Sequence, residues 1–154
     1  MKSLNQWFDE YAVSHQDPTN KAIHYVCVPA IFFSIVGLLM SIPSEFLANN
    51  LKFQQPIIEN WAVIVLVLVL IFYIRLSVVM AAKIAVFALF CLVLNFYIGQ
   101  LVSLSIFSIA VFGVAWVGQF YGHSIEGKKP SFLKDLQFLM IGPAWVVQNL
   151  FSKK

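Results

Sequence analysis

The sequence predicts an all-α integral membrane protein, and three observations support this. Of the 154 residues, 60% are hydrophobic and only 11% are charged, whereas a water-soluble domain carries about 25% charged residues. The mean hydropathy is +0.84. Charged residues are also absent from three long stretches: Ala22–Ser44, Asn60–Ile74 and Ile84–Ile125. We therefore expect one membrane domain over residues 1–154. The small net charge of +3 gives no indication of nucleic-acid binding.

The charge-free stretches predict membrane-spanning helices, because about 20 apolar residues are needed to cross a bilayer. The first two stretches predict one crossing each, over Ala22–Ile42 and Ile57–Ile74. The third is long enough for two crossings with a turn near Gly99–Ser105, and the first of this pair begins near Ser77. The expected fold thus has four transmembrane helices.

Two further helices are expected towards the ends of the chain. Over Leu4–His15, apolar residues recur at helical spacing while Asp9 and Glu10 lie off that face. This pattern is typical of an amphipathic helix lying on a membrane. The apolar segment Leu136–Phe151 is short and contains Pro143, so we interpret it as a re-entrant or interfacial helix, with a fifth crossing as the alternative. Four tryptophans are interpreted mostly as interface anchors: Trp7, Trp61, Trp116 and Trp145.

The distribution of Lys and Arg predicts the orientation in the membrane. With four crossings, all ten of these residues except Lys52 fall on the side that holds both termini. We expect this side to face the cytosol. The Lys153–Lys154 pair lacks the spacing of a dilysine retrieval signal, which favours a bacterial inner membrane. The endoplasmic reticulum is the expected location if the source is eukaryotic.

The three histidines give the main indication of function. In the predicted topology, His15, His24 and His123 all lie at the cytosolic boundary. Imidazole is a ligand for Fe, Zn, Cu and Ni. Three His, or two His with Glu126, would leave coordination positions open, as a catalytic metal requires. Each histidine could instead be an interfacial hydrogen-bonding residue.

The neighbours of these histidines are polar residues at helical spacing. Asp17 can cap a helix that begins at the following proline, which places Asn20 and His24 on one face at i and i+4. Gln119 and His123 have the same spacing. We expect Asn20 and Gln119 to bind near the metal as hydrogen-bond partners that orient the imidazoles.

The same residues carry a resemblance to a known family, the small membrane 2-hydroxy fatty acid dioxygenases. The N-terminal pattern is similar to the first signature of that family: Tyr11…His15…Asp17-Pro18…Asn20…His24…Pro29. A later pattern is similar to the second: Trp116…Gln119…Gly122-His123…Glu126-Gly127…Lys129-Pro130. Pro143 falls where the family has a proline in its last apolar segment. The resemblance covers roughly Leu4 to Phe151, and Ser131 departs from the alanine expected there.

The resemblance implies an Fe(II)-dependent enzyme of lipid metabolism, related to sphingolipid breakdown, that uses O2 for the α-oxidation of 2-hydroxy fatty acids. The product is a fatty acid shortened by one carbon. We assign His15, His24 and His123 as iron ligands. Glu126 is either a fourth ligand or a base to His123, and Lys129 is a candidate partner for the substrate carboxylate.

The expected substrate suits such a site. A 2-hydroxy acid can chelate iron through its carboxylate and its 2-hydroxyl oxygen, while the protein positions the chelate. The expected partners are a 2-hydroxy long-chain fatty acid, O2 and the lipid bilayer. A homo-oligomer of this chain is a further possible partner assembly.

Three other functions fit the same residues. One is a metal-dependent lipid hydrolase, with zinc on the same histidines. A second is a small haem protein with two axial histidines. The third is a non-enzymatic multi-span membrane protein. Metal content and O2 uptake separate these alternatives from the dioxygenase.

Overall fold

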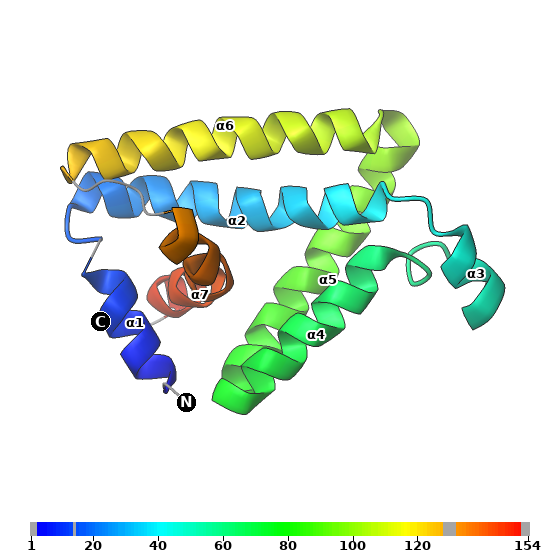
Figure 1. Cartoon of the computed structure of the whole chain (residues 1–154), viewed down its shortest axis with the longest axis horizontal. Helices are drawn as coiled ribbons and strands as arrows, with labels where there is room; N and C mark the ends of the chain where they lie inside the picture. The colour runs from blue at the N-terminus through cyan, green and yellow to red at the C-terminus, as the bar shows by residue number, and fades with distance from the viewer. Residues whose placement is uncertain (1–2, 14, 128–131, 152–154) are drawn as a thin grey trace. The chain divides into compact units, whose positions relative to one another are not determined.

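The computed structural model describes the backbone of residues 3–13, 15–127 and 132–151, and the part described is helical without strands. Figure 1 shows its helices along the chain. They are α1 (Leu4–Ala12), α2 (Pro18–Met40), α3 (Glu45–Leu51), α4 (Trp61–Leu76), α5 (Val78–Leu101), α6 (Leu104–Ile125) and α7 (Phe132–Phe151). The prediction of an all-α fold is confirmed.

Among the residues that the structure describes, three helices are long and apolar enough to cross a membrane: α2, α5 and α6, with 23, 24 and 22 residues. This agrees with three of the four expected crossings. The remaining one corresponds to α4, which has 16 residues and a length of about 24 Å, short of the roughly 30 Å hydrocarbon core. The structure therefore supports three candidate spans, and the fourth crossing stays a prediction.

The helix α4 is shorter than expected because the residues before it form a capped loop. It begins at Trp61 and is capped by Asn60, whose side chain accepts a hydrogen bond from the N–H of Val63 at 3.2 Å. The buried Glu59 accepts from the backbone N–H groups of Phe53 and Gln54, at 2.6 and 3.2 Å. These local hydrogen bonds compete with helix formation.

Other helix boundaries agree with the sequence predictions. The long apolar stretch is interrupted between Leu101 and Leu104, inside the turn expected near Gly99–Ser105. Ser77 caps α5 by accepting from the N–H of Met80. At the N-terminus, Ser3 and Gln6 form a capping box at the start of α1. The C-terminal helix α7 is longer than the predicted Leu136–Phe151 and includes Pro143.

The chain divides into two compact units. The first comprises Met1–Phe32 and Phe112–Lys154, and in it α1 packs against α7. Its core includes buried side chains of α1, α2 and the middle of α7: Tyr11, Val28, Ile31, Ile141, Ala144, Trp145 and Val146.

The second unit is Phe33–Val111. In it α4 packs along α5, as Figure 1 also shows. Polar Asn95 of α5 is fully buried and donates hydrogen bonds to the carbonyl groups of Phe33 and Cys91, at 3.1 and 2.9 Å. Gly37 of α2 lies against the side chains of Asn95 and Ser108. Polar and small residues thus join three helices in this unit, as is common between helices in membranes.

Candidate metal centre

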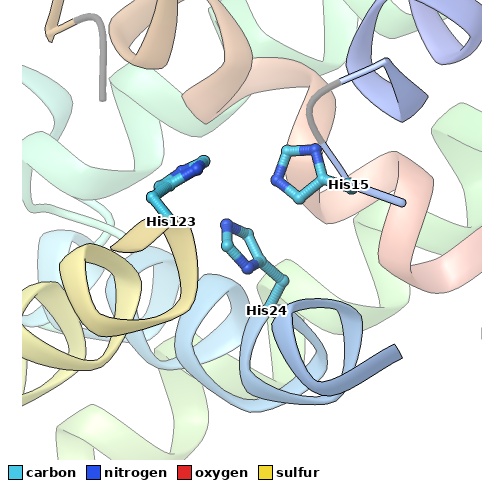
Figure 2. A group of neighbouring side chains, drawn as sticks. All are labelled: His15, His24 and His123. Atoms are coloured by element: carbon cyan, nitrogen blue, oxygen red, sulfur yellow. The ribbon is translucent and has the colours of Figure 1, made fainter. Parts of the chain in front are cut away.

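Three histidines from separate segments of the first unit lie together. His15 follows α1, His24 lies in the second turn of α2, and His123 lies near the end of α6. Figure 2 shows their imidazole rings pointing toward one another. The ring centroids of His15 and His24 are 4.3 Å apart, those of His24 and His123 5.0 Å, and those of His15 and His123 5.5 Å. All three side chains are buried, with exposed fractions of 2%, 1% and 7%.

The geometry of the three rings fits a metal ion. One ligand nitrogen from each ring lies within 4.8 Å of the others. Metal–imidazole bonds of about 2.0–2.1 Å would place the nitrogens that bind one ion about 3–4 Å apart. Small rotations of the rings would bring the three nitrogens to this separation. A set of three imidazoles suits Fe, Zn, Cu or Ni. It would leave positions open for a substrate.

The ring of His15 is fixed by the helix before it. Its Nδ1 lies 2.6 Å from the carbonyl oxygen of Tyr11, and its plane is stacked on the Tyr11 ring, with centroids 4.0 Å apart and an angle of 6°. Trp145 of α7 packs against both rings, at centroid distances of 5.1 and 5.7 Å. Trp145 is 6% exposed and therefore packs inside this unit, unlike the interface anchors that most of the tryptophans were expected to be.

The ring of His24 is held in the same way. Its Nδ1 lies 2.9 Å from the carbonyl oxygen of Asn20, one turn earlier. A carbonyl oxygen only accepts hydrogen bonds, so Nδ1 carries the proton in both His15 and His24. The lone pair of each ring is therefore on Nε2, the arrangement usual in metal-binding histidines. Gln119 of α6 is buried in the same unit.

Two glycines allow α6 to approach α2 closely at this site. A Cβ at Gly122 would collide with the side chain of Asn20, and one at Gly118 would lie 2.6 Å from the sulfur of Cys27. The spacing of the glycines is GxxxG, which permits close contact between membrane helices. This contact lets the imidazoles of His24 and His123 meet.

Glu126 lies directly after α6 and contacts the segments that carry the other histidines. Its Oε1 accepts from the backbone N–H of Gln16 at 2.7 Å, and its Oε2 accepts from the side-chain amide of Asn20. Gln16 also donates from its side chain to the carbonyl of Ala12. Lys129, the candidate partner of the substrate carboxylate, lies outside the described residues.

The structure thus brings six sequence-predicted site residues into one unit: His15, Asn20, His24, Gln119, His123 and Glu126. Sequence reasoning gave Trp145 a different role and did not single out Gly118, and it named Gly122 and Tyr11 only as parts of the family patterns. The GxxxG spacing of Gly118 and Gly122 was a signal that could have been used. The approach of Trp145 was not marked by any local pattern, because it depends on how α7 packs against α1.

The family model described as 2-hydroxy-palmitic acid dioxygenase Mpo1-like matches residues 1–154. No curated protein and no solved structure matches the chain.

Proposed function

Since the chain belongs to the Mpo1-like family of 2-hydroxy-palmitic acid dioxygenases, we propose that it is an Fe(II)-dependent dioxygenase. Its reaction would be the α-oxidation of 2-hydroxy fatty acids with O2, giving a fatty acid one carbon shorter. The observation that carries this proposal is the buried cluster of His15, His24 and His123.

The protein's contribution is a site of fixed imidazoles in an apolar protein. Backbone carbonyl groups orient His15 and His24 so that each presents Nε2, and the close contact of α6 with α2 brings His123 beside them. Iron(II) held by these rings would supply the reactivity toward O2. Three protein ligands would leave room for a bidentate 2-hydroxy acid, and burial of the cluster would restrict access of water.

The surrounding helices suit a substrate with a long acyl chain. In the unit that contains the histidines, α2 and α6 expose apolar side chains such as Val26, Val114 and Val117. An acyl chain entering from the bilayer would lie along such surfaces, while its carboxylate and hydroxyl group reach the histidines. Lys129 is proposed to pair with the carboxylate. We place this end of the helices at the cytosolic face, and the bacterial inner membrane is the favoured location.

The experiment that tests this function combines metal analysis with O2 uptake. The protein is purified without O2 and its iron and zinc contents are measured. We expect iron, with O2 consumption that depends on added 2-hydroxypalmitate and produces the C15 acid. Zinc at full occupancy without O2 uptake would contradict the dioxygenase proposal and favour a metal-dependent lipid hydrolase.

Alanine variants test the ligand assignment. We expect each of three variants to lose iron and turnover, because two imidazoles alone would not hold the ion: His15→Ala, His24→Ala and His123→Ala. Each protein should still be inserted and folded. Full turnover in any of the three would contradict the assignment of that histidine. A Soret band in the purified protein would instead indicate haem.

A further inference from the structure

The carboxylate of Glu126 joins all three segments that carry the clustered histidines. It lies three residues after His123 on the same chain segment. One of its oxygens accepts from the N–H of Gln16, the residue directly after His15. The other accepts from the side chain of Asn20, whose carbonyl oxygen orients His24. Along the chain, His15 is next to Gln16 and His24 is four residues after Asn20, and both of these residues donate hydrogen bonds to Glu126. The third histidine is three residues before Glu126 itself.

The position of Glu126 is unfavourable for the helix that precedes it. A carboxylate at the C-terminal end of a helix lies beside the negative end of the helix dipole. The two hydrogen bonds compensate for this, and hydrogen bonds to an ionised acceptor are stronger than those between neutral groups. The stability of α6 therefore gives no reason for an acid at this position, whereas the connection between the segments does.

The geometry also argues against Glu126 as a metal ligand. Its oxygens are directed toward protein donors of Gln16 and Asn20, from which they accept hydrogen bonds. Among the described His, Cys, Asp and Glu residues, the group whose ligand atoms lie together consists of the three histidines without Glu126.

We propose that Glu126 is a positioning residue that fastens the segments of His15 and His24 to the end of α6, so that the three imidazoles face one point. This inference rests on the proposed metal site. Without the carboxylate, the segment between α1 and α2 would lose its hydrogen bonds to the end of α6, and a metal could bind only after the histidines had been ordered. The free energy of this ordering would appear as weaker metal binding, while the ligands stay the same.

Cobalt(II) is a suitable probe because its visible spectrum reports the ligands as well as the affinity. We expect Glu126→Ala to bind Co(II) about 10–100-fold more weakly than the unsubstituted protein, the range known for loss of a residue that orients metal ligands. At saturation its spectrum should be the same, since the ligands are the same. Glu45→Ala removes an exposed carboxylate from α3 and should change neither quantity.

An exchange of hydrogen-bonding groups provides a rescue test. Asn20→Asp places two carboxylates in contact and should weaken Co(II) binding. In the double variant Asn20→Asp with Glu126→Gln, the amide introduced at position 126 can donate to the carboxylate introduced at position 20, and its oxygen can still accept from Gln16. We expect affinity within about threefold of the unsubstituted protein, as both hydrogen bonds are restored.

The outcomes separate this inference from the proposed function. If the unsubstituted protein binds neither Co(II) nor Fe(II), the metal site itself is wrong. If it binds metal and Glu126→Ala binds equally well, only the positioning role is wrong. A changed Co(II) spectrum at saturation would make Glu126 a ligand and would also overturn the inference. If Glu126→Ala does not fold, the comparison of Asn20→Asp with the double variant decides, and failure of the rescue contradicts the proposal.

Discussion

His15 and His24 are oriented by the same local device, a hydrogen bond from Nδ1 to the carbonyl oxygen four residues earlier. The last turn of α1 and the first turn of α2 thus each orient one imidazole through a local contact. The third ring, that of His123, depends on how closely α6 approaches α2. Substitutions that alter this approach should affect metal binding without touching a ligand.

Gly122→Ala tests the close approach. A Cβ at this position collides with the side chain of Asn20, and overpacking of this kind costs about 1–3 kcal/mol. We expect a lower free energy of unfolding and at least tenfold weaker Co(II) binding. Gly113→Ala is the matched control in the same helix, since nothing lies within 4 Å of its Cβ. Equal metal affinities in the two variants would show that the contact is not needed for the site.

Trp145→Ala tests the aromatic group beside His15. The indole packs on Tyr11, His15 and Tyr25, and removal of a buried Trp side chain costs about 3–5 kcal/mol. We expect a lower unfolding temperature of the metal-free protein and weaker metal binding, because the ring of His15 loses a neighbour. Trp145→Phe should retain most of the thermal stability and most of the affinity for metal. A variant with unaltered stability would mean that this packing is not formed.

The clustered histidines could be singled out from the sequence, whereas the residues that hold their rings could be only partly so. Histidine is rare in this chain, and all three histidines fall at the ends of apolar stretches, so they stand out. Asn20 and Gln119 were found by their helical spacing to a histidine. The hydrogen bonds of Glu126 and the packing of Trp145 were not, because both join segments far apart in the chain and hydropathy does not say which segments meet.

At the scale of the helix, Asp17 caps the start of α2, as the sequence suggested. The carboxylate accepts from the N–H groups of Thr19 and Asn20, at 2.7 and 3.0 Å. The hydrogen bond from Asn20 is the main cause of a pKa of Asp17 below its usual value of 3.8, so the cap is ionised at neutral pH. The cap fixes the first turn of α2, from which Asn20 orients His24.

Asp17→Ala should therefore affect both helix and site. We expect a lower unfolding temperature and weaker Co(II) binding at neutral pH, because the first turn of α2 loses its cap. Asp17→Ser retains a capping oxygen and should behave more like the unsubstituted protein. Thermal unfolding followed by circular dichroism, with and without the metal, measures both effects. If serine and alanine are equivalent at this position, the cap does not contribute.

Asn95 is the corresponding connection in the second unit, where α5 meets α2. Asn95→Ala removes a hydrogen bond to the carbonyl group of Phe33 in α2, and such bonds between membrane helices are worth roughly 0.6–2 kcal/mol. It also removes one to the carbonyl group of Cys91 within α5. We expect destabilisation in detergent micelles of that order. Val93→Ala lies on the same helix at a position 37% exposed and should have a smaller effect. A larger loss for Val93→Ala would contradict the role of Asn95.

At the scale of the whole molecule, the number of crossings is the main open prediction. Hydropathy marks apolar stretches but does not give helix ends, which are set here by local caps such as those of Asn60 and Ser77. If α4 crosses the membrane, residues before and after it lie on opposite sides. If it does not, they lie on the same side.

Single-cysteine labelling distinguishes these topologies. Gln55→Cys and Arg75→Cys, both at exposed positions, are placed in a chain without Cys27 and Cys91 and treated with a maleimide that does not cross membranes. With four crossings, we expect Gln55→Cys to be labelled from outside the cell and Arg75→Cys only after the membrane is opened. Labelling of both from the same side would show that α4 does not span the bilayer.

The spread of the histidines along the chain has a consequence for how the protein is made. His24 and His123 are separated by about 100 residues, which a ribosome takes roughly 5–20 s to add. During this time α2 is present without its partner α6, and the emerging chain has two of its three imidazoles. A complete ligand set would exist only once α6 has been synthesised and has packed against α2. Loading of a metal would thus come after synthesis of α6, and unfinished chains would not hold all three histidines of the site.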